Sequence, residues 1–295
     1  MRHPRLIPLV AVAHGSRDPR AAATVIGLLS AVTARASRRG LPGLDVRAAF
    51  LDHCAPSLPQ VLGSVDNGPA AVVPLLLTAA YHSKADIPAQ LAAAAAASPG
   101  LEVSSAGTLG PHPLLTAALE RRLRDAGVAV DDAGARAATS VVLAAAGSSD
   151  PAANATIAAL AAQWAVERGW RAVVPAYASA AGPRPAEAVL ALLAGGAARV
   201  VVATYLLAPG YFADKIRTAA LGAGAVAVSG VLGAAPEVAD VVLDRYLAAM
   251  AADQSIVAGA PYPVCMVVAP QLGNCVIGGN PRGTDARRTA ASLIT

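Results

Sequence analysis

The sequence predicts two tandem doubly wound α/β domains, each with a parallel sheet of roughly four strands flanked by helices. Apolar runs rich in Val, Leu and Ala alternate along the chain with Ala- and Leu-rich stretches of helical character. This alternation is typical of parallel sheets that are covered on both faces. The stretch VAVAHGSRDP at 10–19 recurs as VVLAAAGSSDP at 141–151, and a length of 295 residues suits two such domains.

The expected strands follow the same order in both halves. They are apolar runs at 5–13, 44–52, 70–77 and 101–107 in the first half, and at 138–145, 170–176, 197–207 and 225–232 in the second. A helix is expected after each run, the last one starting near Pro236. We therefore predict a first domain over 1–132, a second over 133–253 and an irregular tail over 254–295.

The N-terminal run has two interpretations. Arginines precede an apolar stretch that ends in Ala-Val-Ala at 11–13, which resembles the cleavage site of a signal peptide. However, Gly15 aligns with Gly147, and the match continues through Asp18 and Asp150. A cleavable leader has no reason to recur in mid-chain, so we expect the first strand of a cytoplasmic protein.

Composition excludes several classes of protein. The net charge of +4 is mild and aromatic residues make up 3%, so a nucleic-acid partner is not expected. Prolines and glycines interrupt the uncharged stretch 254–281, and no run of about 18 apolar residues predicts a membrane span. Cys54, Cys265 and Cys275 form no CxxC pair, which fits a reducing compartment.

Polar side chains follow three predicted strands of the first half. His14 follows the first strand, Asp52 the second and His82 the third. The carboxyl ends of parallel strands meet at one edge of a sheet, and ligands bind there, near the point where the strand order reverses. Two imidazoles and a carboxylate at this edge predict a metal site.

The second half keeps the scaffold but lacks these polar groups. At the three aligned positions it has apolar residues: Ala146, roughly Ala176, and Phe212. Groups needed for folding would be expected in both copies. We therefore predict one working site in the first half, with the second half forming the other wall of an interdomain crevice.

Four motifs together resemble one protein family. They are VAHGSRDP, AFLDHCAPSL, VPLLLTAAYHSKADIP and, in the second half, YLLAPGYFADKI, and they span roughly residues 6–250. They resemble the class II chelatases, which insert a divalent metal into sirohydrochlorin. The resemblance implies that His14 and His82 are catalytic and contact the metal. It also implies an acidic third ligand, commonly glutamate, where this chain has Asp52.

The implied chemistry suits these residue types. Metallating a tetrapyrrole removes two pyrrole protons and moves the ion from protein ligands into the ring. Imidazole is a base of near-neutral pKa that also binds borderline metals, and a set of two histidines and one carboxylate leaves coordination positions open. The implied substrates are sirohydrochlorin and Fe²⁺ or Co²⁺, leading to sirohaem or to cobalamin. We favour iron and expect no tightly bound cofactor.

Sirohydrochlorin carries many carboxylates, which predicts polar contacts at the same edge of the sheet. The candidate residues are Ser16, Arg17, Lys84 and His112. The helix expected after Asp18 presents backbone N–H groups that favour an anion. On the second wall, Tyr211 or Phe212 is expected to face the macrocycle. If the second strand continues to His53, that residue is expected on the opposite face, because neighbouring side chains alternate along a strand.

Other functions fit the sequence less well. A phosphatase that uses a phosphohistidine needs an arginine directly before its histidine, and here that residue is Ala13. Neither nucleotide-binding glycine motif follows the first strand. Two alternatives stay open: a sirohydrochlorin cobaltochelatase of cobalamin biosynthesis, and a non-catalytic carrier of metal or tetrapyrrole.

Overall fold

The computed structural model describes residues 6–65, 68–79 and 85–254. These ranges form two four-stranded parallel sheets, with strand orders β2-β1-β3-β4 and β6-β5-β7-β8. The strands are β1 (Leu9–Ala13), β2 (Val46–Phe50), β3 (Pro69–Pro74), β4 (Glu102–Ser105), β5 (Ser140–Ala145), β6 (Ala172–Tyr177), β7 (Val200–Tyr205) and β8 (Ala227–Val228). The predicted fold class is confirmed, although each of these strands is shorter than predicted and β8 has only two residues.

Aspartate–proline pairs start the long helix that follows the first strand of each sheet. Asp18 caps α1 (Pro19–Arg38) and Asp150 caps α6 (Pro151–Arg168), each by accepting a backbone N–H two residues further on. Proline at the first helical position is already set to the helical φ. The other helices are α2 (Leu58–Gly63), α3 (Ile87–Ala97), α4 (Pro113–Asp125), α5 (Ala133–Ala138), α7 (Pro185–Ala194), α8 (Tyr211–Gly222) and α9 (Pro236–Gln254).

The helices cover the sheets in layers. Helices α2 and α3 cover one face of the first sheet, and α7 and α8 cover one face of the second. The remaining face of each sheet joins α1, α4, α6 and α9 in one shared apolar core. Along β1 the side chains alternate: Leu9, Ala11 and Ala13 enter this shared core, whereas Val10 and Val12 face α2.

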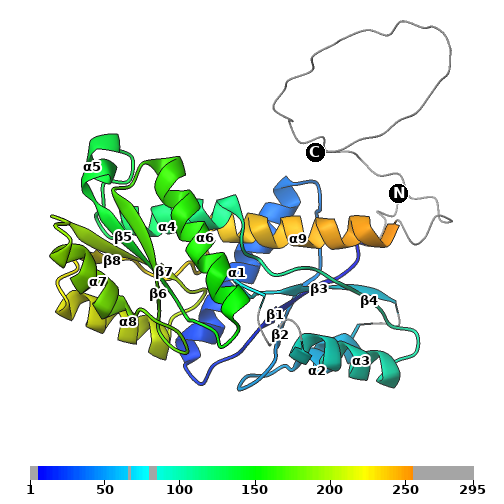
Figure 1. Cartoon of the computed structure of the whole chain (residues 1–295). Helices are drawn as coiled ribbons and strands as arrows, with labels where there is room; N and C mark the ends of the chain where they lie inside the picture. The colour runs from blue at the N-terminus through cyan, green and yellow to red at the C-terminus, as the bar shows by residue number, and fades with distance from the viewer. Residues whose placement is uncertain (1–5, 66–67, 80–84, 255–295) are drawn as a thin grey trace, which may run out of the picture. The chain divides into compact units, whose positions relative to one another are not determined.

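Helices α4 and α9 are exchanged between the two halves. Figure 1 shows α9 in orange beside the blue α1, and it packs on α1 and β3 of the first sheet, whereas α4 packs on β7 of the second. The exchange is reciprocal in its polar contacts. Arg122 of α4 donates to the Leu232 carbonyl at 2.9 and 3.1 Å, and Arg245 of α9 donates to the Leu109 carbonyl at 3.0 Å. The exchange was not part of the predicted organisation into domains over 1–132 and 133–253. Those domain limits stay a prediction.

The repeat can be followed through the sheet register. Phe50 pairs with the last residue of β1, and Tyr177 pairs with the last residue of β5. Two residues further on, Asp52 therefore corresponds to Ser179, and the predicted alignment of Asp52 with Ala176 is wrong. The chain between the first helix and the second strand is shorter in the second half, which shifts the alignment.

No helix in the described ranges combines the length and apolar character that crossing a membrane requires.

Candidate active site

A cavity of about 930 Å³ lies at the carboxyl ends of the central strands of both sheets. The loops after β1 and β3 line it from the first half, and the loops after β5 and β7 with the start of α8 line it from the second. In both sheets the strand order reverses between these strands, which is where open parallel sheets bind ligands. Its volume is near the upper end of the roughly 300–1,000 Å³ typical of small-molecule sites.

His14 follows β1 directly and lines the cavity. Its Nδ1 lies 3.1 Å from the Gly15 carbonyl oxygen, and its own carbonyl accepts the Asp52 N–H at 2.9 Å. Gly15 has φ +92°, and a Cβ there would lie 1.8 Å from the Asp52 carbonyl oxygen. Only glycine lets these two loops pass so closely, so Gly15 fixes where the imidazole stands.

Ser16 and Arg17 line the cavity beside His14. The Ser16 hydroxyl accepts the Asp18 N–H at 3.1 Å, and its carbonyl accepts the Cys54 S–H at 3.1 Å. Arg17 is exposed and supplies a positive charge at the opening. The structure thus brings these two predicted substrate contacts to the same loop as His14.

Alternation along a continued strand would direct Asp52 toward the cavity and His53 away from it, but the structure shows the reverse. His53 lines the cavity, whereas the cavity lining does not include Asp52. The Asp52 carboxylate accepts the backbone N–H of His53 at 2.7 Å and lies 3.4 Å from its Nε2. The condition for His53 to face away is not met, because β2 ends at Phe50 and the chain then turns through a left-handed residue, His53, with φ 62°.

His112 is predicted to contact substrate, but the structure puts it outside the cavity lining. Its Nδ1 accepts the Leu114 N–H at 3.2 Å and so caps α4, and its Nε2 lies 3.7 Å from Asp244 of α9. Burial lowers the pKa of His112, while Asp244 raises it and Arg245 lowers it. One of its two ring nitrogens therefore caps α4 in the described structure.

The second wall carries Ala146 where the first wall carries His14. Asn154 of α6 holds the adjoining loop: its side chain accepts the Ser148 N–H at 3.0 Å and donates to the Ser148 carbonyl at 2.7 Å. Both residues line the cavity, and so does the buried Tyr205, whose pKa is raised by burial. Sequence reasoning missed Asn154, although it stands where the first copy of the repeat has Ala22.

Aromatic side chains stand at the opening on the second wall. Tyr211 and Phe212 begin α8, line the cavity, and are 73% and 38% exposed. Their ring centroids are 5.8 Å apart, and the Lys215 Nζ lies 5.9 Å from the Tyr211 centroid. This cluster offers both apolar area and positive charge to a flat anionic ligand.

The predicted ligand His82 and the predicted substrate contact Lys84 lie outside the described residues. Within 6–65, 68–79 and 85–254, no three His, Cys, Asp or Glu side chains lie close enough together to hold a metal ion. The described part of the site therefore supplies at most a partial ligand set.

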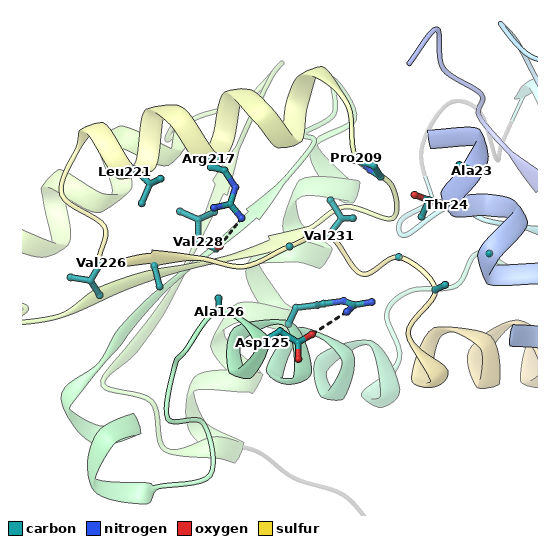
Figure 2. A pocket seen from close by; sticks show the side chains of 16 residues that line it. Ala23, Thr24, Asp125, Ala126, Pro209, Arg217, Leu221, Val226, Val228 and Val231 are labelled. Carbon is teal, nitrogen blue, oxygen red and sulfur yellow. Dashed lines mark hydrogen bonds and ion pairs between the residues drawn. The ribbon is translucent and has the colours of Figure 1, made fainter. Parts of the chain in front are cut away.

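A further cavity of about 860 Å³ lies between α1, the end of α4 and the α8–β8 region. Figure 2 shows Arg217 directed at the Val228 carbonyl, to which it donates at 3.1 Å, and Arg122 forms an ion pair with Asp125. Both arginines are thus engaged with the protein. None of the described residues that the sequence predicts for the site lines this cavity, so we do not assign the function to it.

The fold and the cavity define a class of protein: a duplicated α/β chain with a crevice between its halves and imidazoles on one wall only. The family model for CbiX matches residues 8–126 and 140–249. The chain therefore belongs to the CbiX family.

Individual relatives agree with this assignment. A sirohydrochlorin ferrochelatase of Bacillus subtilis (strain 168) is 28% identical over 208 residues, which are 70% of this chain and 76% of the relative. SirB from Bacillus subtilis with Fe³⁺ is similar in structure, with a TM-score of 0.71 at 24% identity, over 84% of this chain and 97% of that one. SirB from Bacillus subtilis subspecies spizizenii in complex with cobalt has a TM-score of 0.65 at 22% identity, with the same coverage. These structures share the fold.

Proposed function

We propose that this protein is a sirohydrochlorin chelatase, which inserts a divalent metal ion into the tetrapyrrole with loss of two pyrrole protons. The observation that carries the proposal is the one-sided cavity, where His14 follows β1 and Ala146 follows the matching strand β5. A macrocycle between the two walls would meet imidazole on one face only. The curated relative named sirohydrochlorin ferrochelatase supports the same reaction.

In this proposal His14 and His82 accept the pyrrole protons and contact the incoming ion, and Asp52 is the predicted third ligand. Imidazole suits both tasks, because its pKa is near neutral and it binds borderline metals. An incomplete ligand set leaves positions for water and for the pyrrole nitrogens, so that the ion can leave the protein. The metal ion is a substrate.

The substrate carboxylates are assigned to Ser16, Arg17 and Lys84, with the N–H groups at the start of α1 adding a partial positive charge. Tyr211 and Phe212 are assigned to the opposite face of the macrocycle. His112 stays a proposed further contact to the substrate, through the ring nitrogen that does not cap α4.

For the metal we propose Fe²⁺, which gives sirohaem, because the curated relative is named a ferrochelatase. Co²⁺, leading to cobalamin, is the alternative, since nitrogen and oxygen ligands of this kind accept both ions.

An anaerobic absorbance assay tests the reaction. Purified protein is mixed with sirohydrochlorin and with Fe²⁺, Co²⁺ or Ni²⁺ in turn, and the rate is compared with that of the uncatalysed reaction. We expect many turnovers per protein molecule, fastest with Fe²⁺. Stoichiometric binding of metal or tetrapyrrole with no acceleration would instead identify a carrier.

The second wall is tested by Tyr211→Ala and Phe212→Ala. We expect both to raise KM for sirohydrochlorin, because each removes exposed aromatic area at the opening. Val166→Ala is the matched control, since Val166 is 85% exposed on α6 and is absent from the cavity lining. Unchanged KM and turnover in both aromatic variants would exclude substrate contact by this wall.

A further inference from the structure

His53 brings an additional imidazole to the cavity. Its ring centroid lies 6.4 Å from that of His14, with the two planes inclined at 45°. Its side chain is 34% exposed and lines the same cavity as His14. The rings of His14 and His53 therefore lie on the same wall of the cavity, the one formed by the first half.

The loop that carries His53 does not need an imidazole to fold. Its counterpart in the second half has Ala180 at the equivalent position, with φ 58° against 62° for His53. The two loops close in the same way, because Phe50 and Tyr177 each donate to the carbonyl of the residue six positions ahead. Ala180 also lines the cavity. The left-handed conformation thus belongs to the scaffold, and the imidazole is an addition made only in the half that carries His14.

The Asp52 carboxylate lies beside this imidazole, although Asp52 is not among the residues that line the cavity. Its carboxylate accepts the backbone N–H of His53 at 2.7 Å and faces Nε2 at 3.4 Å. At the equivalent position of the second half, Ser179 donates instead to the Ala146 carbonyl at 2.9 Å. A carboxylate that faces one ring nitrogen keeps the proton on that nitrogen and leaves the lone pair of the other nitrogen for a ligand. For His53 the nitrogen with the lone pair is then Nδ1.

We infer that His53 contacts the incoming metal ion together with His14, and that Asp52 is a positioning residue that acts through His53. The inference rests on the proposed function and reassigns Asp52 within it. Imidazole nitrogens bind such ions at about 2.1 Å, so two rings on one ion have centroids about 5 Å apart at a tetrahedral angle and about 6.5 Å apart when the two nitrogens lie on opposite sides of the ion. The 6.4 Å between His14 and His53 corresponds to the second arrangement.

Co²⁺ binding to the full chain without tetrapyrrole tests the inference. His53→Ala reproduces the residue of the second half, Asp52→Asn keeps the shape of the side chain, and the double variant combines them. We expect His53→Ala to weaken Co²⁺ binding, measured by calorimetry, by at least about tenfold, and Asp52→Asn by about tenfold. Because Asp52 acts through His53, the double variant should bind as weakly as His53→Ala and no more weakly.

The controls separate a folding defect from a binding defect. Ser179→Ala changes the matching position of the second half and should keep wild-type Co²⁺ affinity. His53→Ala should unfold at the wild-type temperature, as expected if Ala180 occupies the same backbone conformation. Wild-type Co²⁺ affinity in His53→Ala would overturn the role of His53. If Asp52→Asn lowers Co²⁺ affinity by the same factor in the wild-type protein and in His53→Ala, the positioning role is overturned and Asp52 is a direct ligand.

The proposed function is tested separately by the insertion assay on the wild-type protein. If wild type binds Co²⁺ through His53 but does not accelerate insertion, the proposed function fails and the metal contact stands. If wild type accelerates insertion and His53→Ala binds Co²⁺ normally, the metal contact fails and the proposed function stands.

Discussion

Gly15→Ala should damage both stability and turnover, and the second half provides its control. The new Cβ would lie 1.8 Å from the Asp52 carbonyl oxygen, at a residue with φ +92°. A left-handed alanine costs about 1–2 kcal/mol, and relieving such an overlap costs about 1–3 kcal/mol. The variant should therefore unfold about 4 to 20 °C below wild type in calorimetry, on a scale of about 2–4 °C per kcal/mol.

Gly147→Ala meets the same obstacle in the second half, with its Cβ 2.0 Å from the Ser179 carbonyl oxygen and φ +84°. It should destabilise the protein by a similar amount. The two variants should differ in kcat, measured at a temperature where both are folded. Gly15→Ala moves the His14 loop and should lower kcat about a hundredfold, whereas Gly147→Ala should keep kcat near wild type. Equal losses of kcat would refute a one-sided site, and wild-type stability of Gly15→Ala would refute the close approach.

The remaining predictions concern imidazoles and helix contacts. His14→Ala and His82→Ala should abolish insertion while the unfolding temperature stays within a few degrees of wild type, and near wild-type turnover in either would contradict their assignment. Arg122→Ala or Arg245→Ala leaves a buried leucine carbonyl without its donor and should cost about 1–3 kcal/mol in denaturant unfolding; no change would show that the exchanged helices are held by packing alone. Burial lowers the pKa of His112 from 6.5, so the unfolded chain takes up the proton first and stability should fall as pH drops below about 6.5. His112→Asn keeps a helix cap and should lose this pH dependence, which unfolding curves at pH 5 and pH 8 would reveal.

The alternation of strands and helices was predictable because each buried strand is a continuous apolar run. The starts of α1 and α6 were predictable as well, since an aspartate followed by proline both caps a helix and fixes its first φ. The exchange of α4 and α9 was not. The pattern of an amphipathic helix shows that one face is buried, but it does not say which sheet covers that face.

The site was predictable only in part. The ends of β1 and β2 gave His14 and Asp52 as candidates, and the structure brings the loops that carry them together through the Asp52 N–H and the His14 carbonyl. Alternation failed at His53, because it holds only while the backbone stays extended. The equivalence of Asp52 and Ser179 was missed because a shorter connection in the second half changes the alignment between the two copies.

Because the two halves exchange helices, their association depends little on the peptide link between them. Helix α9 supplies part of the cover of the first sheet and α4 part of the cover of the second, so neither half can bury its apolar face by itself. Heating should therefore melt both sheets in one cooperative event. A cut in the link between α4 and α5 should leave two pieces that remain associated, because interlocked helices rather than the peptide bond hold them together.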